Sequence, residues 1–128
     1  MEFAAELKRQ AQAERDQGRL EEARRLYEQA AERYRALNDP LALAHTVRHV
    51  ADIHRQQGHP ELAARCYDEA LMIYRANAET PQLDLANAIR GLALLKNEAT
   101  LWQEARDLYA EVGVDAGVNE CSRRLAAL

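Results

Sequence analysis

The chain repeats itself at an interval of 40 residues, and this repeat limits its possible folds more than any other feature. When the sequence is shifted by 40, residues 18–36 align with residues 58–76, and nine of the nineteen positions are identical. The identical positions include a leading glycine, regularly spaced alanines and tyrosines, and a closing Tyr-Arg-Ala. A further shift of 42 reaches Ala105 and Tyr109, which belong to a less regular third unit. A fixed period of this length indicates stacked copies of one supersecondary unit.

Each unit has the hydrophobic spacing of two helices. The spacing i, i+4, i+7, i+11 places four residues of the first unit on one helical face, namely Ala23, Tyr27, Ala30 and Tyr34. The 128 residues are rich in Ala, Leu, Glu, Arg and Gln and hold only five Gly and three Pro, a composition that excludes an all-β fold. We therefore predict helices over residues 3–17, 20–37, 41–57, 60–78, 82–98, 101–112 and 116–127.

The breaks between these helices carry recognisable end signals. Asp39 and Thr80 each precede a proline, so we expect them to be N-caps with proline at the first helical position. Gly18 and Gly58 supply the positive φ that a tight turn inside a unit requires. In the third unit we expect a capping box that begins at Thr100 to replace that glycine.

This pattern resembles the tetratricopeptide repeat, a helix pair with glycine before a tight turn, then Ala, a Tyr four residues later and Ala three beyond that. Small residues also occur where that family packs its helices closely, at Ala11, Ala51 and Ala93 in the first helices and Ala23, Ala63 and Ala105 in the second. The repeat of 40–42 residues is longer than the family's usual 34, and the first helices lack its usual Trp and Tyr. It is closer to the extended repeats of kinesin light chains and many bacterial regulators.

The resemblance implies an all-α, right-handed superhelical solenoid in a single domain of residues 1–128. It would contain three antiparallel helix pairs, in units of about residues 3–37, 41–78 and 82–112. The last helix, residues 116–127, resembles a first helix without its partner, and we expect it to cap the open end of the stack.

Several function classes are excluded by composition and motifs. A net charge of −4 argues against a nucleic-acid binder, and no apolar run is long enough for a membrane helix. Cys66 and Cys121 have no redox or metal-binding spacing, so we expect reduced thiols in a cytoplasmic protein. A Gly-rich phosphate loop, GxSxG and HExxH are all missing from the sequence, and we expect neither catalysis nor a cofactor.

One cluster suits a metal ion by its spacing. His45, His49 and Asp52 follow i, i+4, i+7 and share one helical face, where imidazole and carboxylate could bind Zn²⁺ or Ni²⁺. The other interpretation is that the histidines lie on a polar face beside Arg48 and Arg55, which would repel a cation. We favour this second interpretation and predict no metal site.

The resemblance also implies a ligand surface, because the first helix of every tetratricopeptide pair lines a concave face. The family's groove positions correspond here to eighteen residues with six basic and three acidic side chains, a net of +3. We predict that twelve of them contact a ligand: Lys8, Arg9, Gln12, Arg15, His45, Arg48, His49, Asp52, Arg55, Asn87, Arg90 and Asn97. The remaining six are Ala5, Asp16, Gln56, Gly91, Leu94 and Glu98.

A basic stripe on an acidic chain favours an acidic partner, since a concave wall concentrates the local potential. Lys8, Arg48 and Arg90 recur at the same repeat position. Lys8 also matches the carboxylate clamp of chaperone-binding members, but Gln12 and His49 depart from it, as do Asn87 and Gly91. We therefore predict a non-enzymatic scaffold that binds an acidic peptide or helix rather than a chaperone tail. The alternatives are a face that is merely solvated, and a structural module that forms homo-oligomers through its ends or belongs to a longer array.

Overall fold

The computed structural model describes residues 2–128 and, within them, consists of α-helices without a strand. In chain order these are α1 (Glu2–Asp16), α2 (Leu20–Ala36), α3 (Pro40–Gln56), α4 (Pro60–Arg75), α5 (Gln82–Lys96), α6 (Ala99–Glu111) and α7 (Asp115–Ala126). Every predicted helix is present, which confirms the all-α class. Met1, the first residue of the predicted domain, lies outside the described residues. No helix in the described part of the chain has the length and apolar character needed to cross a membrane.

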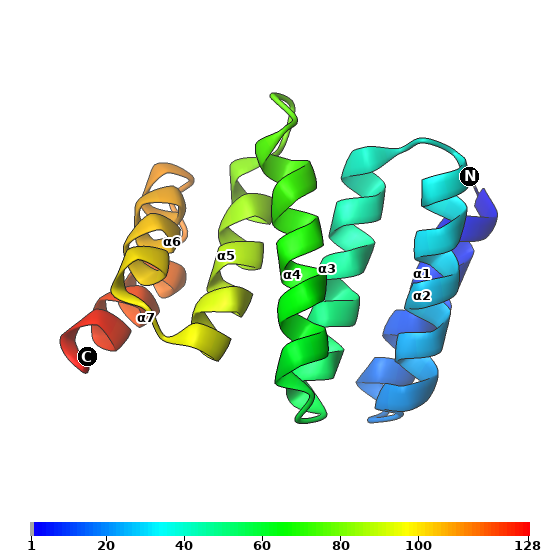
Figure 1. Cartoon of the computed structure of the whole chain (residues 1–128), viewed down its shortest axis with the longest axis horizontal. Helices are drawn as coiled ribbons and strands as arrows, with labels where there is room; N and C mark the ends of the chain where they lie inside the picture. Colours follow the sequence, from blue (N-terminus) through cyan, green and yellow to red (C-terminus); the bar gives the residue numbers. More distant parts are fainter. Residues whose placement is uncertain (1) are drawn as a thin grey trace.

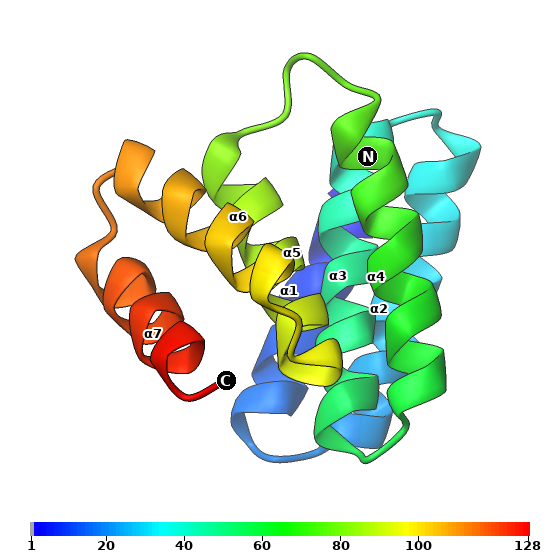
Figure 2. The same ribbon diagram turned by 60° about the vertical axis from the view of Figure 1, so that its left-hand side comes forward.

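Consecutive helices pack against one another along the whole chain, as in a helical repeat solenoid (Figure 1). In Figure 1 α2 lies in front of α1 and α4 in front of α3, so the helices form two layers, which Figure 2 shows from a second side. Exposed ion pairs join neighbours within the layer of α2, α4 and α6, one between Arg35 and Glu69 at 3.0 Å and one between Arg75 and Glu104 at 2.7 Å. We call the outer surface of the other layer, formed by α1, α3, α5 and α7, the first-helix face. The right-handed superhelix and the single-domain boundaries stay predictions.

The turns inside the first two units form as expected. Gly18 and Gly58 adopt φ of +80° and +79°, a conformation that side chains rarely allow. Between α5 and α6 the residue with positive φ is Asn97, whose φ of +52° and ψ of +43° place it in the left-handed region. An asparagine tolerates this conformation better than most residues, so the third unit keeps its turn without a glycine.

Two of the three predicted N-terminal signals are wrong. Asp39 is the expected N-cap, and its carboxylate accepts a hydrogen bond from the Ala42 backbone at 3.3 Å. Thr80 instead donates to the carbonyl of Tyr74 at 2.7 Å, which closes the end of α4 and leaves Pro81 to precede α5. Thr100 lies inside α6, because the left-handed Asn97 ends α5 early enough for the next helix to begin at Ala99.

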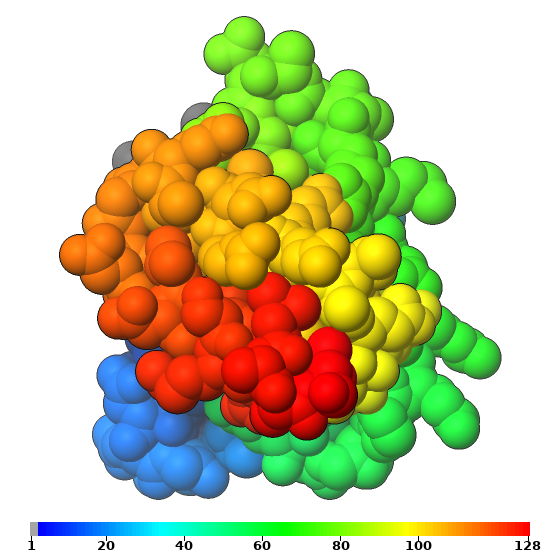
Figure 3. Space-filling view, turned by 90° about the vertical axis from the view of Figure 1, so that its left-hand side faces the viewer, coloured from blue at the N-terminus to red at the C-terminus, as the bar shows by residue number. Residues whose placement is uncertain are grey.

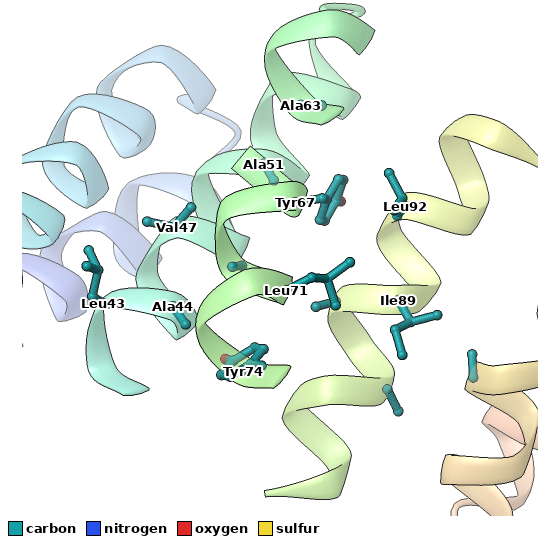
Figure 4. Packing of buried hydrophobic residues seen from close by; sticks show 14 of the residues in the cluster. Leu43, Ala44, Val47, Ala51, Ala63, Tyr67, Leu71, Tyr74, Ile89 and Leu92 are labelled. Atoms are coloured by element: carbon teal, nitrogen blue, oxygen red, sulfur yellow. The ribbon is translucent and has the colours of Figure 1, made fainter. Parts of the chain in front are cut away.

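The predicted close-packing alanines are all fully buried. Each has 0% of its surface exposed: Ala11, Ala23, Ala51, Ala63, Ala93 and Ala105. Figure 4 shows Ala51 and Ala63 between α3 and α4, with Tyr67 and Leu71 directed toward α5. Small side chains at these positions let the helix backbones approach, and the tyrosines fill the remaining space.

Two glycines make room for these tyrosines on the next first helix. A Cβ at Gly91 would overlap the ring of Tyr67, and a Cβ at Gly117 would overlap the ring of Tyr109. Gly91 is buried beneath this contact, so it supports packing and does not line the outer face. The same arrangement at α7 shows that the last helix packs on α6 as α5 packs on α4.

We predict that Gly91→Ala destabilises the protein. In an ordinary helix interior this change adds about 1 kcal/mol of stability, whereas overpacking a dense contact costs about 1–3 kcal/mol. The melting temperature should therefore fall, as measured by circular dichroism. In a Tyr67→Leu background the clash is absent, and Gly91→Ala should then raise the melting temperature. A rise in the otherwise unchanged protein would show that the ring does not rest on Gly91.

Candidate functional site

The structure brings predicted residues of the first two units together on the first-helix face. The ammonium group of Lys8 donates to Nδ1 of His45 at 2.9 Å, and Arg15 Nη1 donates to Nδ1 of His49 at 3.2 Å. The two imidazole rings meet edge to face with centroids 4.7 Å apart. Side chains from α1 and α3 therefore form one continuous cluster.

Both histidines are neutral in this cluster. Burial, with Lys8 next in importance, lowers the pKa of His45 to about 4. Burial, followed by Arg48, lowers the pKa of His49 to about 2. Because ammonium and guanidinium groups only donate, each Nδ1 is an acceptor and each proton resides on Nε2. The cations occupy Nδ1 of each ring, and the described residues hold no group of three or more metal-ligating side chains.

Asp52 is the carboxylate at the centre of the same face. It accepts from Arg48 Nη1 at 2.8 Å and from the hydroxyl of Tyr67, and Arg55 Nη2 lies 3.6 Å away. The Nε of Arg55 also donates to the Tyr67 hydroxyl at 3.1 Å. Only 15% of the side-chain surface of Arg48 is exposed, so this residue lies largely beneath the surface.

The cluster holds more positive than negative charge. It contains four cations: Arg48 and Arg55 contact the carboxylate of Asp52, whereas Lys8 and Arg15 contact the two histidines. The Nε of Arg48 is buried without a hydrogen-bond partner. Unbalanced cations in a partly buried setting interact strongly with an incoming anion, because water screens them weakly there.

Two further residues of α1 complete the site. Gln12 accepts from the hydroxyl of Tyr27 at 3.1 Å and donates to Asp16 at 2.8 Å, so its amide is engaged within the protein. The Tyr27 ring stacks on His49 with centroids 4.9 Å apart. Arg9 is the most accessible of the predicted cations on α1, with 66% of its side chain exposed, and it donates through Nε and Nη2 to Glu6 on the same helix.

In the third unit the predicted residues are already paired with other side chains. Asn87 accepts from the Tyr109 hydroxyl at 2.7 Å. Arg90 donates through Nε and Nη2 to both carboxylate oxygens of Glu120, at 2.5 and 3.1 Å. Glu120 belongs to α7 and is absent from the predicted set. The resemblance of residues 116–127 to a first helix is the signal that could have placed it on this face.

Asn97 serves the fold of the third unit and lies apart from the cluster. It ends α5 in the left-handed conformation, and its Oδ1 accepts from the indole nitrogen of Trp102 at 3.0 Å. Trp102 is fully buried. Asn97 therefore has a structural role in the turn, and its contact with a ligand stays a prediction.

A family model described as tetratricopeptide repeat matches residues 3–76, more than half of the chain. The chain belongs to the tetratricopeptide repeat family. The match spans α1 to α4, the two units that share the 40-residue period. Tetratricopeptide repeats generally mediate protein–protein interaction, and the family typically provides non-enzymatic scaffolds. No curated protein matches the chain. The likeness to the kinesin light chain type of repeat stays a prediction.

The opposite layer of this tetratricopeptide repeat stack carries surface features that the sequence did not indicate. A hollow of about 500 Å³ lies where the α2–α3 turn meets α4, and Tyr34, Ile73 and Met72 line part of it. Met72 is 73% exposed.

Both cysteines are free thiols, and burial raises the pKa of Cys66 to about 11.

We predict that the protein loses stability as the pH falls from 7 toward 4. The unfolded histidines take up protons near pH 6.5, whereas the folded His45 and His49 do so only near pH 4 and pH 2. The unfolded state therefore binds more protons in this window, and stability decreases with pH. The charged groups that face the two rings are Lys8 and Arg15 from α1, Arg48 and Asp52 from α3, and Asp84 from α5.

The double variant His45→Gln, His49→Gln tests this assignment. Its melting temperature should depend less on pH between 6.5 and 4.5 than that of the unchanged protein, even if both values are lower. Equal slopes in the two proteins would mean that these histidines are not held neutral by the fold.

Proposed function

We propose that the protein is a cytoplasmic, non-enzymatic scaffold whose first-helix face binds an acidic peptide or helix. The observation that supports this proposal is the cluster of four cations on α1 and α3, two of which contact Asp52 and two the neutral histidines. Family membership supplies the coarser part, since tetratricopeptide repeats generally mediate protein–protein interaction. The positive charge of the cluster is the reason for proposing that the partner is acidic.

The accessible cations are the ones that meet the ligand first. Arg9 is well exposed, and Lys8 and Arg15 are partly exposed between α1 and α3. Their guanidinium and ammonium groups form charge-assisted hydrogen bonds with carboxylates, which are shorter and stronger than neutral ones. Arg48 and Arg55 lie deeper and contribute mainly through the potential that they add to the face.

The neutral histidines suit this role. With Nδ1 engaged by a cation, each ring holds its proton on Nε2 and can offer a neutral donor. Because the rings are uncharged, they leave the positive charge of the neighbouring lysine and arginines unopposed. A ligand with regularly spaced acidic residues would therefore find donors from both α1 and α3.

Charge reversal at the rim tests this function. The variant Arg9→Glu, Arg15→Glu changes the face by four charge units at exposed and partly exposed positions and spares the less accessible Arg48. We expect its affinity for a fluorescein-labelled peptide of alternating glutamate and leucine, measured by fluorescence anisotropy, to fall by about tenfold or more. Binding by the unchanged protein should also weaken as salt rises from about 50 to about 500 mM.

A matched control distinguishes the effect of this face from the effect of the protein's net charge. Arg25→Glu, Arg65→Glu makes the same charge change on exposed residues of α2 and α4 and should alter binding by less than about threefold. Equal losses in the two variants would contradict a site on the first-helix face. Light scattering on the free protein tests the other candidate, because a mass that rises with concentration would favour self-association.

A further inference from the structure

In the third unit the cation of the first-helix face, Arg90, is paired with Glu120 of the same chain. Arg90 holds Glu120 through two hydrogen bonds, at 2.5 and 3.1 Å, and the carboxylate of Glu120 has only 17% of its side-chain surface exposed. The hydrogen bonds from Arg90 keep the pKa of Glu120 below its usual value, so it is ionised at neutral pH. Arg124 approaches the same carboxylate at 3.6 Å.

Arg90 occupies the repeat position that Lys8 and Arg48 hold in the first two units. At this position of the third unit the partner is an acidic side chain presented by a helix, α7. This is the chemistry proposed above for the external ligand. The contact between α5 and α7 therefore resembles the bound state of the site.

The surroundings of this ion pair leave room for an exchange. A hollow of about 310 Å³ lies between α5 and α7, and Leu83, Tyr109 and Gly117 line it together with Arg90 and Glu120. The packing of α7 is against α6, and Figure 3 shows these two helices covering the end of the stack. Glu120 can thus leave Arg90 while α7 keeps its packing on α6.

We propose that Glu120 is an internal competitor that occupies the α5 end of the ligand surface, and that a carboxylate of the acidic partner replaces it on Arg90. This inference rests on the proposed function. Arg90 has 38% of its side chain exposed, so a carboxylate from outside can reach it, and the exchange replaces one carboxylate partner by another. An intramolecular carboxylate has a high effective concentration, so its removal strengthens binding of the external one.

The test compares acidic-peptide binding by the unchanged protein and by Glu120→Gln, with the same labelled peptide at about 50 mM salt. Glu120→Gln should bind at least about threefold more tightly. Glu111→Gln removes the same charge from an exposed position on α6 and should change the affinity by less than about 1.5-fold. In the double variant Arg90→Gln, Glu120→Gln the gain should disappear, because the cation that receives the peptide is gone.

The outcomes separate this inference from the proposed function. Binding by the unchanged protein with no gain in Glu120→Gln, or a gain that persists without Arg90, overturns the internal competitor and leaves the proposed function standing. Binding by neither protein removes both proposals. If Glu120→Gln fails to fold, Glu120→Asp takes its place, since the shorter side chain loses its reach to Arg90 and should give a gain in the same direction. An absent gain there overturns the inference as well.

Discussion

The contact of Tyr67 with two successive first helices is the interaction on which the fold and the site both depend. Its hydroxyl donates to Asp52 on α3, and its ring lies on Gly91 of α5. The same phenol therefore fixes the spacing of α3 and α5 and holds the carboxylate that positions Arg48. Burial and the charge of Asp52 both raise the pKa of Tyr67, which keeps the hydroxyl protonated and able to donate.

Much of the fold could be predicted from the sequence because its determinants are local or periodic. The alanine spacing defined which faces are buried, and glycines at positions such as Gly18 defined the turns. Of the two wrong N-cap predictions, that of Thr100 failed because α6 begins earlier than expected, and that of Thr80 because the residue had two possible partners. Thr80 had the chemistry of an N-cap, but its hydroxyl closes the end of the preceding helix through the carbonyl of Tyr74. That choice depends on how the chain turns back, which a local pattern does not contain.

The positions of the candidate site could be predicted from the sequence, but the hydrogen bonds and ion pairs between its side chains could not. The repeat register assigned Lys8 and Arg48 to one face, and the α1–α3 contacts at that face bring Lys8 to His45. The pairing of Arg90 with Glu120 could not be read in this way, since the two residues are 30 positions apart and belong to helices that are not consecutive. The resemblance of residues 116–127 to a first helix could have placed Glu120 on this face, but its pairing with Arg90 is shown by the structure alone.

The neutrality of the two histidines has an electrical consequence for the whole face. Because His45 and His49 take up protons only near pH 4 and pH 2 in the folded protein, these two rings add no positive charge to the α1–α3 cluster from pH 8 down to about pH 5. An imidazole at its ordinary pKa would add positive charge over that range and act as an acidity sensor. In this protein the positive charge of the cluster comes from its arginines and lysine, and the two histidines give the face no response to mild acidification.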